Sequence, residues 1–103
     1  MTDEKVLLNQ ILDWADDRGL ISVLSPNPQM LKVVEEVGEL SSAILKNDRE
    51  KTIDAIGDTL VTVIILSAQL GLNPFDCLKS AYNEIKDRKG KTINGTFIKQ
   101  EQQ

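Results

Sequence analysis

Apolar residues recur every three or four positions through most of the chain, which is the spacing of helices with one buried face. The predicted helices cover about residues 3–18, 28–46, 49–70 and 74–89. Asn27, Asp48 and Asn73 stand where a helix N-cap is needed, and a proline follows the first and last of them. Such a cap accepts a free backbone N–H, and proline fits the first helical turn. Glycines at positions 19, 71 and 90 close three of the helices.

The second and third predicted helices carry the most apolar surface. In the second, the apolar stripe is centred on Val37, which is therefore predicted to face the core. In the third, residues 60–66 are rich in β-branched side chains and resemble a buried strand, but they continue the helical pattern of Ile53, Ile56, Leu60 and Ile64. A helix that is apolar on every side is not a surface helix. One of its faces is expected to meet the core and another a second subunit.

The tail differs from the rest of the chain. Asn94-Gly95 lies between short β-prone pairs, which is a strong signal for a two-residue hairpin turn. The chain as a whole predicts one all-α domain over residues 1–103, resembling a four-helix bundle, with residues 91–103 as a C-terminal extension that can form a short hairpin.

The composition limits which binding partners and metals are expected. The net charge of −4 over 103 residues argues against nucleic acid and anionic membranes. The N-terminus is acidic, and no apolar run approaches the ~20 residues of a membrane span, so the protein is expected in the cytoplasm. Cys77 is the single cysteine, expected to pack in the bundle, and there is no histidine. A bound metal would therefore be held by oxygen, as Mg²⁺, Mn²⁺ and Ca²⁺ are.

The second helix contains a group of acids. Glu36 and Glu39 are three residues apart and share one side at the edge of the apolar stripe, whereas Glu35 is expected on the opposite flank of the polar face. Two carboxylates at a core boundary repel each other, and a divalent cation would relieve that cost.

The third helix contains the same short pattern as the second, an aliphatic residue followed by glycine and an acid. Ile56-Gly57-Asp58 matches Val37-Gly38-Glu39. Glycine costs ~1 kcal/mol in a helix interior, so the two glycines suggest that the helices cross closely where the acids converge. Asp54 lies one turn before Asp58. The acids of both helices would then surround one metal pocket. The plainer interpretation is a pair of solvated helix faces, with Lys32 pairing to Glu36 at i+4.

Residues 32–40 and 54–60 resemble the MazG-type nucleotide pyrophosphohydrolases, an all-α superfamily, and the resemblance covers nearly the whole chain. The pattern of that family is Glu-x-x-Glu followed, a helix later, by Glu-x-x-Asp. Glu36, Glu39 and Asp58 match it, while Ala55 stands where the third acid is usual. The resemblance is strongest to short members common in phage and prophage genomes.

The resemblance implies Mg²⁺-dependent hydrolysis of nucleoside triphosphates, (d)NTPs, to a monophosphate and pyrophosphate, with Mn²⁺ as a substitute. Glu36, Glu39 and Asp58 would be catalytic metal ligands, and Asp54 or Glu35 could replace the missing acid. Expected substrate contacts are Lys32, Asn83, Lys86 and Arg88.

Trp14, the only tryptophan, either stacks on the base or packs in the core. The cations near position 88 have an alternative role, because they also suit a helix C-terminus. A homodimer or homotetramer is expected. Ala55 keeps open a different class of function, a non-catalytic helical module that dimerises or binds nucleotide.

Overall fold

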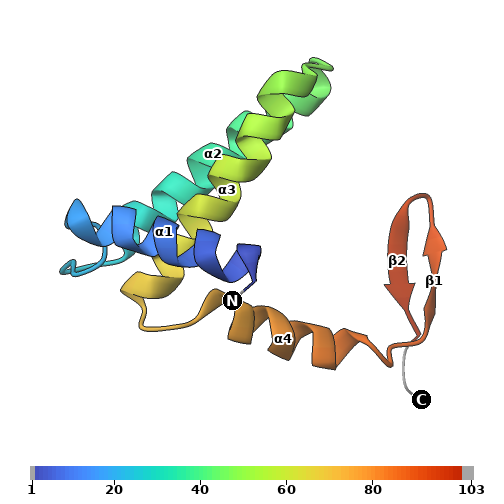
Figure 1. Ribbon diagram of the computed structural model, residues 1–103. Helices are drawn as coiled ribbons and strands as arrows, with labels where there is room; N and C mark the ends of the chain where they lie inside the picture. Colours follow the sequence, from blue (N-terminus) through green and yellow to red (C-terminus); the bar gives the residue numbers. More distant parts are fainter. Residues whose placement is uncertain (1, 101–103) are drawn as a thin grey trace.

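The computed structural model describes residues 2–100 and contains four helices followed by a two-stranded hairpin (Figure 1). The helices are α1 (Asp3–Asp17), α2 (Asn27–Leu45), α3 (Arg49–Gln69) and α4 (Pro74–Ile85). The strands are β1 (Gly90–Ile93) and β2 (Thr96–Lys99), paired antiparallel with Ile93 opposite Thr96. The expected all-α class with a short terminal hairpin is confirmed.

Local signals explain most element ends. Asp48 caps α3 by accepting from the Lys51 N–H at 3.1 Å, and Asn73 caps α4 by accepting from Phe75 and Asp76. Asn94 and Gly95 both have positive φ, as a tight hairpin turn requires.

Two predicted boundaries are wrong. Asn27 is the first residue of α2 rather than its cap, and its N–H instead donates to Ser25 Oγ at 3.2 Å. The fourth helix ends at Ile85 instead of continuing to position 89, and Gly90 begins a strand. Residues 86–89, where the local pattern still allowed a helix, instead form a turn and a short link to β1.

The centre of the molecule is the pair α2 and α3, which run side by side, with α1 packed against α3 (Figure 1). The buried apolar side chains are small or few, namely Leu8, Ala15, Val33, Ala43, Ala55 and Ile65. Gln29 links the two central helices by donating from Nε2 to the Thr62 carbonyl at 3.1 Å. The interface between α2 and α3, called the seam below, is therefore narrow, and it positions the site.

The buried face of α2 is shifted to one side of the predicted one, although Val33 of the predicted stripe is buried. Val37 is 48% exposed, whereas Glu36 is only 6% exposed and lies in the contact with α3. The stripe around Val37 remains open because α2 meets α3 along its neighbouring side.

The fourth helix and the hairpin lead away from this centre (Figure 1). Within the described residues, α4 contacts only α3 and the hairpin contacts no helix. Cys77 on α4 is exposed, so its expected packing in the bundle is wrong.

The expectation that no segment is long and apolar enough to span a membrane also changes. By length and composition alone α3 could cross a membrane, although the sequence pattern predicts no run of this size. Core helices of soluble proteins meet the same criterion, so this is weak evidence for a span.

Candidate functional site

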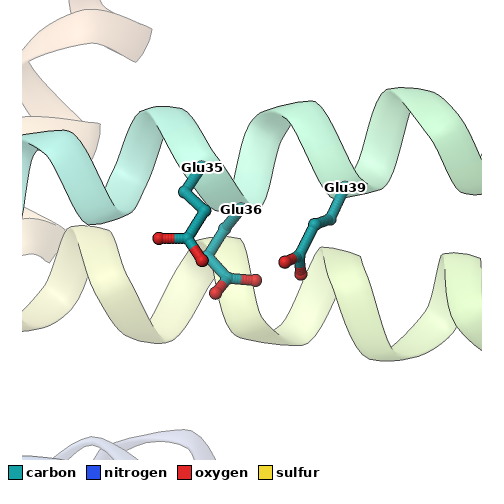
Figure 2. A group of neighbouring side chains, drawn as sticks. All are labelled: Glu35, Glu36 and Glu39. Carbon is teal, nitrogen blue, oxygen red and sulfur yellow. The ribbon is translucent and has the colours of Figure 1, made fainter.

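Three glutamates of α2 form a compact cluster. One carboxylate oxygen from each of Glu35, Glu36 and Glu39 lies within 4.8 Å of the others. Figure 2 shows all three side chains hanging from α2 toward α3. The expectation that Glu35 lies on the opposite flank is wrong, because its flexible side chain bends back toward Glu36 (Figure 2).

Glu36 is the buried member of the cluster. Its Oε2 atom is buried and has no hydrogen-bond partner within residues 2–100. Lys32 Nζ lies 3.6 Å from Glu36 Oε1 and 3.4 Å from Glu35 Oε1, so the predicted i+4 pair exists but is shared. A buried carboxylate with a free oxygen is costly, and one half-exposed lysine satisfies only part of it.

The electrostatics of Glu36 reflect this position. Burial raises the pKa of the Glu36 carboxyl, and the neighbouring Glu39 and Asp58 raise it further, while Lys32 opposes them. Mainly through Glu35, the acids in turn raise the pKa of the Lys32 ammonium. The cluster thus carries more negative charge than the protein itself neutralises.

The acids of α3 lie beside those of α2. A pocket of about 390 Å³ between the helices is lined by Glu39, Asp54, Ala55 and Asp58, with Lys46 and Lys51 among its other residues. Asp58 also lines a second pocket together with Glu36. Asp58 thus lies beside Glu39 in one pocket and beside Glu36 in the other, but within the described residues neither Asp58 nor Asp54 belongs to the compact cluster of α2. Ala55 is 5% exposed and sits among these acids, so a fourth carboxylate is missing at a position that faces the site.

The two glycines do not mark a close crossing, contrary to expectation. A Cβ added to Gly38 or Gly57 would meet no atom within 4 Å. Each glycine is two residues from a buried position, Glu36 or Ala55, and so points about 200° away from it around the helix. Both glycines therefore face outward from the seam.

The second pocket is larger and mostly apolar, at about 850 Å³. Its lining includes Trp14, Gln29, Lys32 and Gln69, in addition to the acids Glu36 and Asp58. Trp14 is 47% exposed, so it is not a core residue. The Arg18 guanidinium lies 4.2 Å from the centre of the Trp14 ring, which is a cation–π contact.

The other expected substrate contacts are elsewhere. Asn83 is on α4, and Lys86 and Arg88 follow it; all three are exposed. Neither pocket is lined by a residue of α4 or of the hairpin. A single chain does not bring these residues to the acids.

Sequence reasoning missed two polar residues of the large pocket. Gln29 is seven positions before Glu36 and so shares its helix face, a signal that extending the acidic face by two turns would have found. Gln69 bonds to the Leu20 carbonyl, 49 residues away in sequence, and no local pattern predicts that contact.

Comparison with known proteins gives a consistent result. The model of the MazG nucleotide pyrophosphohydrolase domain matches residues 25–92, more than half of the chain. An uncharacterized 18.2 kDa protein from the rep–hol intergenic region of Haemophilus phage HP1 (strain HP1c1) is 41% identical over 69 residues. That match covers 67% of this chain and 42% of the phage protein. No solved structure matches the chain.

The matched range 25–92 contains both acidic segments and the whole α2–α3 pair. With more than half of its length covered by that domain, the chain belongs to the MazG nucleotide pyrophosphohydrolase family.

Proposed function

We propose that the protein hydrolyses nucleoside triphosphates to nucleoside monophosphate and pyrophosphate in a reaction that requires Mg²⁺. The observation that carries the proposal is the buried, unpartnered Oε2 of Glu36, with carboxylates of Glu35 and Glu39 close by and Asp58 on the facing helix. Such an arrangement is unfavourable without a cation and suits one well.

The residues present fit a hard divalent ion. All the available ligands are carboxylate oxygens, which favour Mg²⁺, with Mn²⁺ able to replace it. Glu36, Glu39 and Asp58 would hold the ion. Glu35 belongs to the compact cluster and Asp54 lines the pocket beside Glu39 and Asp58, so these two acids would assist directly or through water. When bound, the ion would neutralise phosphate oxygens and lower the pKa of a water molecule.

The large pocket offers a place for the nucleoside beside these acids. Its apolar lining and the Trp14 ring suit a base, and Lys32 lies at the acidic end where phosphates would be. The work of the protein would be to orient the triphosphate and keep bulk water from the base.

A second copy of the chain would complete this assembly, as a homodimer or a homotetramer. The chain exposes 8504 Å², whereas a compact monomer of 11.5 kDa exposes about 5800 Å². The radius of gyration is 16.6 Å against about 13 Å for 103 residues in a compact domain. The excess is roughly 2700 Å² per chain, or about 5400 Å² for two chains, which lies at the upper end of the total area buried in obligate dimers. Asn83, Lys86 and Arg88 could then contact the phosphates of the neighbouring copy.

A non-catalytic module is the competing function, and Ala55 is the observation that favours it. The side chain at position 55 faces the acids and cannot bind a metal. In that case nucleotide would bind without turnover. In either case the apolar faces would associate and the protein would reside in the cytoplasm.

One assay separates the two functions. The purified protein is incubated with a panel of NTPs and dNTPs plus Mg²⁺, and pyrophosphate release is measured. We expect Glu39→Gln and Asp58→Asn to abolish release and to weaken Mn²⁺ binding measured by titration calorimetry. Glu4→Gln on α1, an exposed acid far from the site in sequence, is the matched control and should retain both. Turnover that survives both site substitutions refutes the assigned roles.

A further inference from the structure

The large pocket extends from the acids toward the last turn of α3. Asp58 lines its acidic end and Gln69 lies eleven residues further along the same helix. At 1.5 Å per residue these two positions are about 16 Å apart along the axis. A nucleotide with its phosphates near Asp58 would therefore place its base toward Gln69 and Trp14.

Gln69 presents an acceptor in this region. Its Nε2 donates to the Leu20 carbonyl at 2.7 Å, which fixes the orientation of the amide because a carbonyl oxygen can only accept. The Oε1 atom is buried and has no hydrogen-bond partner within residues 2–100. A buried acceptor without a donor is unfavourable. A ligand that donates an N–H to this oxygen would therefore bind more tightly.

No other side chain of the pocket donates to this oxygen in the part of the chain that the structure describes. Gln29 also donates its amide to a backbone carbonyl, that of Thr62. Lys32 is engaged by Glu35 and Glu36 at the acidic end, and the Thr62 hydroxyl donates to the Thr59 carbonyl at 2.8 Å. Hydrogen-bond acceptance is therefore the property that the Gln69 end presents.

We propose that Gln69 determines base specificity by accepting a hydrogen bond from an exocyclic amino group of the base. The pocket would then favour nucleotides of cytosine and adenine over their deaminated counterparts, uracil and hypoxanthine. Deamination replaces an amino donor by a carbonyl, which would face the Gln69 oxygen with a second acceptor. This inference rests on the proposed function in so far as the pocket is the nucleoside site.

The test uses Trp14, the only tryptophan, as a probe of occupancy that needs neither metal nor turnover. Quenching of its fluorescence is titrated with dCMP against dUMP and with AMP against IMP. The amino member of each pair should bind about tenfold more tightly to the wild type. In Gln69→Leu the ratio should fall to within about twofold, and Gln69→Met serves if the leucine variant fails to fold. Ser67→Ala is the control, because Ser67 is in the same region of α3 but does not line the pocket. The substitution removes a side-chain hydrogen bond to the Val63 carbonyl and should keep the preference for the amino member.

The possible outcomes are separable. The proposal is overturned if the wild type binds both members of each pair equally, or binds the deaminated member more tightly. It is also overturned if Gln69→Leu leaves the ratio of the two affinities unchanged. Hydrolysis of triphosphates with no quenching by any of the four monophosphates also overturns it, because the base then lies elsewhere. A preference that depends on Gln69 in a protein without hydrolytic activity supports the proposal and refutes the catalytic function instead.

Discussion

Leu60 lies in the middle of an apolar stripe on α3 that a single chain leaves uncovered. It is 60% exposed, and Ile53 and Ile56 beside it are 59% and 46% exposed. If a second copy covers this stripe, Leu60→Ala should weaken the association of the two chains and leave the fold of each intact.

The size of the effect follows from the exposed fraction. Full burial of a leucine side chain contributes about 1.5–3 kcal/mol, so the exposed three fifths of Leu60 contribute about 1–2 kcal/mol per chain. A two-fold dimer contains the residue twice, giving about 2–4 kcal/mol. The dissociation constant should then rise roughly 30- to 700-fold.

The assay is sedimentation equilibrium over a range of concentrations, with circular dichroism to verify helicity. Leu7→Ala is the matched control, because Leu7 is 57% exposed but lies on α1 rather than on α3. The reasoning is refuted if the wild type stays monomeric over a 100-fold range of protein concentration. It is also refuted if Leu60→Ala and Leu7→Ala raise the dissociation constant equally.

Three further predictions concern the metal site and helix stability. Because the pKa of Glu36 is raised, the folded chain holds more protons than the unfolded chain above pH 4.5, so its stability without metal should fall as pH rises through that window. Glu36→Gln should remove this dependence in thermal melts; an unchanged slope would contradict it. Ala55→Glu should lower metal-free stability and increase Mg²⁺ affinity, measured by calorimetry, because it adds an acid among acids; weaker affinity would mean that the site is built around alanine. Asn73→Ala removes a cap that accepts two N–H groups and should cost about 1 kcal/mol in urea unfolding, and an unchanged midpoint would exclude that role.

The sequence alone determined the features whose causes lie within a few residues. The caps Asp48 and Asn73 and the Asn94-Gly95 turn act on their immediate neighbours, so the pattern predicts them. The convergence of Glu36 and Glu39 follows from the helical repeat in the same way. The missing acid at Ala55 is also visible in the sequence, because it depends only on which residue occupies one position of the acidic pattern.

Tertiary structure decided which faces are covered and which distant groups meet. The periodicity around Val37 shows that an apolar face exists, but not that α3 would pack beside it and bury Glu36 instead. The periodicity also does not show that α4 ends at Ile85, and the bond from Gln69 to the Leu20 carbonyl joins separate segments. Helical propensity and capping are local free energies, whereas burial depends on what the rest of the chain, or a second chain, places against each face.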